Sequence, residues 1–474
     1  MSTSHASRPT VSDPHLRSLM AAANLRRCLR GDVLMPGDPS YDEARTGWNR
    51  TVESAPAVIA VARDRADVVA VVQAARRHEL PLAVQSTGHG TLTSADGCLL
   101  LRLSRMDDVA VDPVHLTATV GPGATWHQVN AATTAHGLGS LAGRCGTVGV
   151  TGYTLGGGSA WLSRTHGYAA DSVLSAEVVT ADGELVRASS EENPDLFWAL
   201  RGGGGSFGVV TSLTFRLYPA AGVFSGMSFY PAERAPAILS AYRDWSADEP
   251  DGMNTAVLLA RLPPAPSVPP ALHGRQVVAI RVFAVTDEAT GRRQAAPLLD
   301  AAGPALVDAF AVRPFAQASE VTNGGDPPPL PHRQLVHLFE ELDDELLELL
   351  VAHGLAADAP YGFVELRHWG GAMAEAGLDA GPAGHRDTPW SVLAVAPYLG
   401  PDRTPVDERV DRLDGALAER ATGGSFLNLL TDPDRTASAF TPDNYARLRA
   451  VKAVWDPDDV FRPSHHIPPA GPPA

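Results

Sequence analysis

A histidine and a cysteine stand in two glycine-rich stretches that could hold a bound ring or phosphate. His89 lies between Gly88 and Gly90 in "QSTGHGT" (85–91), and Cys145 precedes "GTVGVTGYTLGGG" (146–158). Glycine lets backbone N–H groups approach a ligand closely because no Cβ stands in the way. Imidazole nitrogen and thiolate are both nucleophiles that can form covalent bonds. The two stretches therefore predict one ligand site with two potential attachment points.

The glycines do not match the common nucleotide-binding motifs. None forms G-x-G-x-x-G directly after a strand, so a Rossmann nicotinamide site is not expected, and no P-loop motif is present. A third stretch, "RGGGGSFGVV" (201–210), is expected to complete the same site. One glycine-rich loop often only turns the chain, but three within one α/β unit favour a ligand cradle.

Composition restricts the class of protein. The chain has 474 residues, 44% hydrophobic and 19% charged, with a net charge of −16, which argues against nucleic acid or an anionic membrane as a partner. Cys28, Cys98 and Cys145 form neither a disulfide framework nor a metal-ligand pattern, so no metal site is predicted. No signal peptide or membrane-length apolar run is apparent, so a cytoplasmic location is expected.

The elements that would position these residues alternate regularly between residues 51 and 219, whereas residues 1–50 are expected to be irregular. Apolar periodicity predicts strands and helices in turn, and a hairpin at 172–188 with Ala-Asp-Gly at its turn. The expected strands are 57–62, 81–86, 98–104, 116–120 and 207–219, and the expected helices are 65–80, 125–137 and 193–203.

The pattern changes after Pro219. Longer strands and amphipathic helices predict an antiparallel sheet with helices packed on one face, so the fold class is α+β. The expected strands are 254–262, 275–285, 361–369 and 391–399, and the expected helices are 233–245, 332–354, 406–420 and a last one from 441.

The chain resembles the berberine-bridge-enzyme-like oxidoreductases of the vanillyl-alcohol-oxidase superfamily, which have a PCMH-type FAD-binding domain. The resemblance is carried by "TGHG" (87–90), "CGTVGVTGYTLGGG" (145–158), "LFWALRGGGGSFGVVTSLTF" (196–215), "VELRHWGGAMAE" (364–375) and a closing segment at 444–469. It implies an FAD-binding domain over 1–219 with its core at 51–219, a substrate-binding domain over 220–425, and a segment, 426–474, that returns to the FAD-binding domain. The FAD-binding domain would then consist of two parts.

The resemblance also implies how FAD is held. His89 matches the histidine bonded to the flavin 8α-methyl group, and Cys145 matches the cysteine that some members bond to flavin C6, in the register C-x-x-V-G-V. The alternative for Cys145 is a small buried side chain. The other FAD contacts that the resemblance implies are Ser86, Thr87, Gly88, Gly90, Thr91, Thr147, Val148, Gly149, Gly152, Tyr153, Gly156, Gly208, Val209 and Val210.

The catalytic base is the weakest part of the match. Many relatives have a tyrosine base in a Y-x-N-Y stretch, but the equivalent "SFLNLL" (425–430) has Phe426 there, which cannot accept a proton. Tyr153, Glu365 and His466 are the remaining candidates. Tyr153 could instead be a packed ring, His466 only a hydrogen-bond donor, and Glu365 an ion-pair partner of Arg367, since strand alternation puts Tyr361, Phe363, Glu365 and Arg367 on one face.

Three functions remain open, and we favour the first. It is an FAD-linked oxidase that takes a hydride from a bulky specialised metabolite by alcohol oxidation, dehydrogenation or oxidative cyclisation, with molecular oxygen as the final acceptor. The second is a monooxygenase-like enzyme that inserts oxygen. The third is a non-redox cyclase that binds FAD only as a scaffold.

Overall fold

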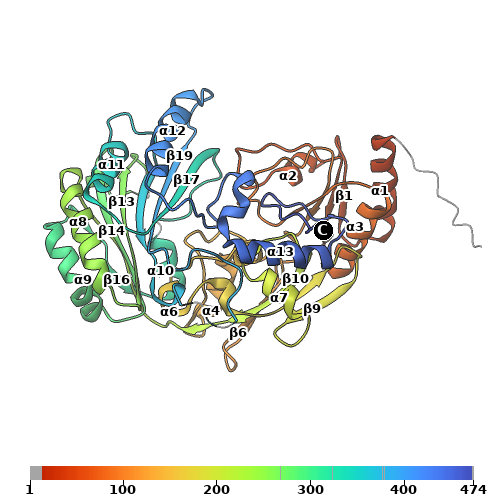
Figure 1. The fold of residues 1–474 in the computed structure, drawn as a ribbon, viewed down its shortest axis with the longest axis horizontal. Helices are drawn as coiled ribbons and strands as arrows, with labels where there is room; N and C mark the ends of the chain where they lie inside the picture. The colour runs from red at the N-terminus through yellow and green to blue at the C-terminus, as the bar shows by residue number, and fades with distance from the viewer. Residues whose placement is uncertain (1–12, 267, 323, 376, 378, 472–474) are drawn as a thin grey trace, which may run out of the picture.

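The computed structural model describes residues 13–266, 268–322, 324–375, 377 and 379–471, and Figure 1 shows β-structure gathered toward both ends of a long molecule. One end holds a four-stranded and a five-stranded sheet together with a small two-stranded one. The four-stranded sheet has the spatial order β1 (Asp32–Leu34), β2 (Val58–Val61), β4 (Leu99–Arg102) and β3 (Leu82–Gln85). The five-stranded sheet has the order β5 (Val109–Asp112), β6 (Thr117–Val120), β10 (Val209–Arg216), β8 (Val173–Val179) and β9 (Leu185–Ser189). The third pairs β11 (Tyr218–Pro219) with β7 (Leu138–Gly139).

The four-stranded sheet is covered by two helices, α1 (Pro14–Cys28) and α3 (Arg65–Arg77), whose apolar faces share one core with it. Asp64 begins α3 by accepting hydrogen bonds from the backbone N–H groups of residues 66 and 67. The prediction that residues 1–50 are irregular is wrong for the described part, because α1, β1 and α2 (Tyr41–Arg45) lie there. Asp13 caps α1 and Pro14 occupies its first turn, a helix start that the polar composition concealed.

The other end is one eight-stranded sheet in which every pairing is antiparallel, as predicted. One face packs against α8 (Ala235–Trp245), α9 (Glu288–Ala302), α11 (Asp344–Gly354) and α12 (Thr404–Ala418), so helices cover one face as expected (Figure 1). The strands in spatial order are β15 (Val307–Asp308), β12 (Val223–Pro231), β14 (Gln276–Ala284), β13 (Met253–Arg261), β18 (Phe363–His368), β19 (Trp390–Pro397) and β17 (His332–Phe339), and β16 (Ala311–Arg313) also pairs with β12.

One helix prediction in this half is wrong. Residues 332–354 form strand β17 followed by helix α11, because 332–339 pairs with β19 along its whole length. Asp343 then starts the helix by accepting from Leu346 N–H. The expected face of Tyr361 is also wrong, since this residue precedes β18 and packs with the helix-covered core.

The two faces of the large sheet differ in chemistry. Val257, Leu259, Val364 and Leu366 point to the covering helices. On the opposite face, Ala256 of β13 pairs with Arg281 of β14 on one side and with Arg367 of β18 on the other. Charged side chains are thus placed on the face away from the helices.

The C-terminal helix α13 (Pro442–Trp455) packs beside α7 (Pro194–Leu200) at the end that holds the two smaller sheets. Its Leu448 and Val451 join the core formed by residues from 118 to 223. Lys452 is fully buried and donates to Ser206 O, Asp456 and Phe461 O. The last segment of the chain is therefore bonded to the third glycine-rich stretch.

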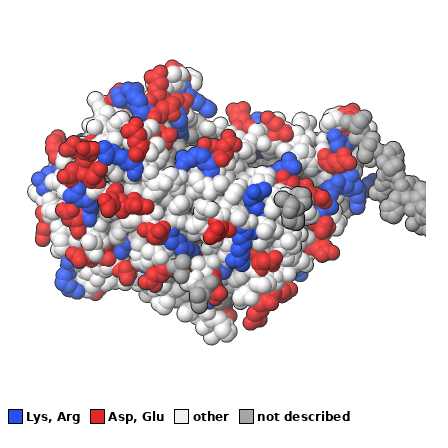
Figure 2. All heavy atoms as spheres, viewed as in Figure 1, with Lys and Arg blue, Asp and Glu red and all other residues white. Residues whose placement is uncertain are grey.

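Charge is mixed over the surface that Figure 2 draws, with acidic side chains gathered where α8, α9 and α11 lie. Among the described helices, we find none with the length and apolar character needed to cross a membrane.

Candidate active site

The His89 loop, residues 86–91, follows β3 and is fixed by residues 48 and 49. Trp48 N–H donates to Thr87 O at 3.0 Å, and Asn49 N–H donates to Gly88 O at 3.1 Å. The Trp48 indole stacks on the His89 imidazole, with ring centroids 4.0 Å apart and planes 16° apart. Gly88 has a φ of +82°, and a Cβ there would lie 2.6 Å from a neighbouring backbone carbon, so the turn needs glycine. These contacts set the orientation of the imidazole.

The Cys145 loop, residues 143–149, leads into helix α5 (Val150–Leu155). Gly146 N–H donates to Asp326 Oδ1 at 2.8 Å, and the other oxygen of Asp326 bonds to His127. Gly149 N–H donates to Thr87 Oγ1 at 3.3 Å, which joins this loop to the His89 loop. Two segments more than fifty residues apart in sequence therefore meet as one site.

Thr147 lies between the two nucleophilic side chains. Its Oγ1 is 3.0 Å from His89 Nε2 and 3.1 Å from Cys145 Sγ. The imidazole and the thiol are therefore no more than two hydrogen-bond lengths apart. This spacing suits two attachment points on one edge of a fused ring, the 8α-methyl and C6 positions of a flavin.

Burial keeps both side chains neutral. It lowers the pKa of His89 to about 4, so the imidazole is unprotonated at neutral pH. It raises the pKa of Cys145 to about 11, and the nearby Asp326 carboxylate acts in the same direction. Neutral imidazole is the nucleophilic form of histidine, whereas the neutral thiol is the unreactive form of cysteine.

Several buried polar atoms around these loops lack a hydrogen-bond partner among the described residues. They are Ser86 Oγ, Thr151 Oγ1, Tyr153 OH and Thr154 Oγ1. Buried polar groups are normally bonded, so these four atoms are suited to a bound polar ligand. Open space also lies where Gly90 and Gly152 would carry a Cβ. The donors, acceptors and free space fit FAD.

Residues 425–430 lie against this cradle. Asn428 donates to Tyr153 O at 3.0 Å and accepts from Gly158 N–H at 2.8 Å. Phe426 is buried and stacks on Tyr168, with ring centroids 5.3 Å apart. The position that the resemblance assigns to a tyrosine base is therefore filled by a packed ring.

Glu365 forms ion pairs beneath the cradle. Its Oε2 contacts Arg144 of the Cys145 loop and Arg281 of β14, and its Oε1 lies 3.5 Å from Arg367 Nε. We call Arg144, Arg281 and Arg367 the arginine cluster. A carboxylate that already accepts from these cations has its lone pairs engaged, which supports the ion-pair interpretation and not the role of a base.

Known proteins match both ends of the chain. Residues 56–189 match the family described as FAD binding domain, and residues 414–468 match berberine and berberine like. (R)-6-Hydroxynicotine oxidase of Paenarthrobacter nicotinovorans is 27% identical over 470 residues, which cover 94% of this chain and 98% of that protein. The crystal structure of 6-hydroxy-D-nicotine oxidase from Arthrobacter nicotinovorans aligns with a TM-score of 0.80 at 26% identity, over 93% and 98% of the two chains.

The chain is an FAD-dependent oxidoreductase with an FAD-binding region and a berberine-like C-terminal region. A glucooligosaccharide oxidase of Acremonium strictum, described with a 6-S-cysteinyl, 8α-N1-histidyl FAD, shares the fold of this oxidoreductase. It aligns with a TM-score of 0.82 at 22% identity, over 95% of this chain and 99% of that one.

Of the other two candidate bases of the oxidoreductase, Tyr153 is held in its protonated form and His466 is paired with a carboxylate. Burial raises the pKa of Tyr153 strongly, so its phenol stays protonated, and its ring packs edge-on against Trp126. His466 Nε2 bonds to Asp459 at 2.8 Å, beside the buried Lys452. Ser464, two residues before His466, accepts from Leu92 N–H, so the C-terminal segment does lie against the end of the His89 loop.

The remaining predicted cofactor contacts lie in two places. Thr91, Val148 and Gly156 lie in or next to the two loops of the oxidoreductase, where Thr91 O accepts from Asn49 and Val148 O accepts from Trp126 N–H. Val209 and Val210, which follow Gly208, instead pair with β8 and have buried side chains. No hydrogen bond between the Gly208–Val210 segment and either loop is found in the described residues.

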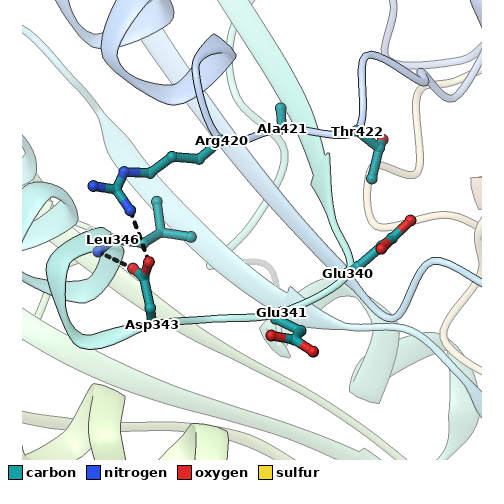
Figure 3. A pocket seen from close by; sticks show the side chains of 7 residues that line it. All are labelled: Glu340, Glu341, Asp343, Leu346, Arg420, Ala421 and Thr422. Atoms are coloured by element: carbon teal, nitrogen blue, oxygen red, sulfur yellow. Dashed lines mark hydrogen bonds and ion pairs between the residues drawn. The ribbon is translucent and has the colours of Figure 1, made fainter.

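A cavity of about 260 Å³ opens beside the Cys145 loop, and Arg144, Gly146, His127 and Ser319 are among the residues that line it. A larger cavity of about 440 Å³ lies at the far end of the large sheet (Figure 3). The residues lining it are Glu340, Glu341, Asp343, Leu346, Arg420, Ala421 and Thr422, none of which belongs to the predicted site.

Sequence reasoning missed several residues that build this site: Trp48, Asn49, Arg144, Arg281 and Asp326. The "GWN" at 47–49 lies in a stretch with no apolar periodicity, and nothing local connects it to His89. Arg144 directly precedes Cys145, and this adjacency was the one available signal.

Proposed function

We propose that the chain is an oxidase whose FAD is bonded to His89 and also to Cys145. The observation that carries this proposal is that His89 Nε2 and Cys145 Sγ both lie within hydrogen-bond distance of the Thr147 hydroxyl. Four buried polar atoms without a partner among the described residues lie nearby. When bound, FAD supplies a two-electron acceptor that molecular oxygen reoxidises. His89 and Cys145 would fix its orientation and raise its reduction potential.

We also propose that the FAD-binding domain comprises 1–219 and 426–474, with the substrate-binding domain over 220–425. Asn428, Phe440 and Leu448 support the two-part arrangement, because the first bonds to the glycine-rich segment and the others join its core. The substrate would then lie between the cradle and the face of the large sheet that the helices leave open.

The protein would supply no tyrosine base at position 426, because Phe426 fills it. We propose that the substrate therefore enters already deprotonated, or loses its proton to solvent as the hydride leaves. The (R)-6-hydroxynicotine oxidase and chitooligosaccharide oxidase relatives are both named as oxidases, which supports this class of reaction.

The test is to precipitate the purified protein in acid and map flavin-bearing peptides by mass spectrometry. Flavin on both the His89 and the Cys145 peptide is expected, together with hydrogen peroxide release when an oxidisable metabolite bleaches the flavin. Colour that leaves the polypeptide entirely would refute the covalent link. Turnover without any change in flavin absorbance would refute the oxidase proposal and favour a non-redox role.

A further inference from the structure

Three arginines, two of them buried and one partly exposed, share one carboxylate on the open face of the large sheet. Arg144, Arg281 and Arg367 all contact Glu365. The side chains of Arg281, Arg367 and Glu365 are only 2–4% exposed. Three positive charges against one negative charge leave an excess of two, and uncompensated charge is costly in a protein interior.

The neighbouring carboxylates do not remove this excess. Glu249 is itself engaged by His368 at 2.6 Å and by Arg164 at 3.6 Å. Asp326 bonds to His127 and to the backbone of the Cys145 loop. Each of these acids is already matched by a separate partner.

The arginine cluster also has N–H donors that are unpaired or only weakly paired among the described residues. Arg367 Nη2 is buried and lacks a hydrogen-bond partner in the part of the chain that the structure describes. Its Nη1 donates weakly to Ser159 Oγ at 3.4 Å, and its Nε reaches Glu365 only at 3.5 Å. The partner of Arg367 on the next strand is Ala256, whose small side chain separates it from Arg281.

Burial and mutual repulsion disfavour the charged forms of the arginine cluster, and the cluster lies next to a cavity. Burial lowers the pKa of Arg367 to about 9, and the charge of Arg144 acts in the same direction. Burial lowers the pKa of Arg144 to about 10. Arg144 also lines the 260 Å³ cavity beside Cys145, so a small molecule there would meet the cluster at this side chain.

We propose that the arginine cluster binds a carboxylate of the substrate, so that the enzyme acts on carboxylate-bearing metabolites. Guanidinium groups bind carboxylates through paired N–H···O bonds, and a carboxylate would offset the excess charge. A neutral sugar or a cationic alkaloid would leave that charge uncompensated. The inference rests on the proposed function, because it assigns the substrate class of the same oxidase.

The second cavity provides a matched control. Arg420 there is fully engaged by Asp343 at 2.7 Å and by Glu345, and Glu340 and Glu341 line the same cavity (Figure 3). It therefore combines an arginine with an excess of negative charge and should repel anions. Arg420→Gln removes a cavity arginine without touching the cradle.

The test titrates the holoenzyme, with its flavin content measured, with benzoate and with the neutral isostere benzamide. Benzoate is expected to give a saturable flavin difference spectrum and to bind at least tenfold more tightly than benzamide. Arg144→Gln should weaken benzoate binding at least tenfold, and Arg420→Gln should leave it unchanged. Isothermal titration calorimetry supplies a readout that does not depend on the flavin.

Equal affinity for benzoate and benzamide on the unaltered holoenzyme would overturn the proposal without any variant. It would also be overturned if Arg144→Gln left benzoate binding unchanged but lowered the flavin reduction potential, because the cluster would then serve the reduced cofactor. Loss of flavin from the unaltered protein would count against the proposed function alone, so the two failures are distinguishable.

Discussion

The His89 loop and the Cys145 loop each bury one nucleophile, and the same burial has opposite chemical results. Removing an ionisable group from water disfavours its charged form. For His89 this lowers the pKa to about 4 and leaves the reactive neutral imidazole at physiological pH. For Cys145 it raises the pKa to about 11 and leaves the unreactive thiol.

This difference teaches that two nucleophiles on one ring need not be equivalent. The His89 imidazole is reactive without losing a proton and is oriented by stacking on Trp48. Cys145 must lose a proton beside the Asp326 carboxylate, which opposes the thiolate. We therefore expect the link to His89 to form first and to be the more complete of the two.

The largest expected effect is that of His89→Ala. Without the imidazole, Cys145 alone must capture the ring as a protonated thiol, so most of the flavin should be released on acid precipitation. The measurement is the fraction of flavin absorbance that remains with the pellet. His332→Ala is the matched control, because His332 contacts the same Trp48 edge-on at 6.0 Å and should leave the colour bound.

Cys145→Ser should have a smaller effect. Flavin should remain on the His89 peptide, and the reduction potential should fall by at least about 30 mV, which is about 1.4 kcal/mol for a two-electron couple. Cys98→Ser, which removes a thiol whose pKa is also raised by burial, should leave the potential unchanged. An unchanged potential in both variants would mean that Cys145 only packs.

The pH dependence of attachment separates the two loops further. Below a pKa of about 11 the thiolate fraction of Cys145 rises about tenfold per pH unit, so the second link should form faster as pH increases from 6 to 9. The imidazole of His89 is already neutral above a pKa of about 4, so the first link should form at a nearly constant rate. Apoprotein incubated with FAD and oxygen, sampled by mass spectrometry, measures both rates. Parallel rates would contradict the comparison.

The sequence predicts much of this site because its chemistry is local. Residue type alone singles out the glycine-rich stretches, His89 and Cys145. Apolar periodicity predicts the strands and the hairpin of 51–219. The return of Asn428 to the glycine-rich segment followed from resemblance alone. That Phe426 replaces a tyrosine base also rests on the resemblance and stays a prediction.

What the sequence could not predict depends on contacts between distant segments. Nothing near Glu365 indicates that Arg144, more than two hundred residues earlier, would reach it. Likewise, "HRQLVHLF" has apolar spacing compatible with a helix, and only its pairing with β19 makes it a strand. In both cases a long-range contact overrides or completes the local signal.

The smallest effect is expected from removing the Thr147 hydroxyl, which contacts the nucleophilic side chain of each loop. Thr147→Val removes the hydroxyl next to both His89 Nε2 and Cys145 Sγ while keeping the shape of the side chain. Each lost hydrogen bond is worth about 1 kcal/mol, so both links should form three- to tenfold more slowly. Thr119→Val, at an exposed side chain of strand β6, is the isosteric control and should change neither rate. Because the imidazole keeps its stacking on Trp48 and the thiol has no such support, the Cys145 link should slow more than the His89 link, and equal slowing would show that Thr147 orients both nucleophiles alike.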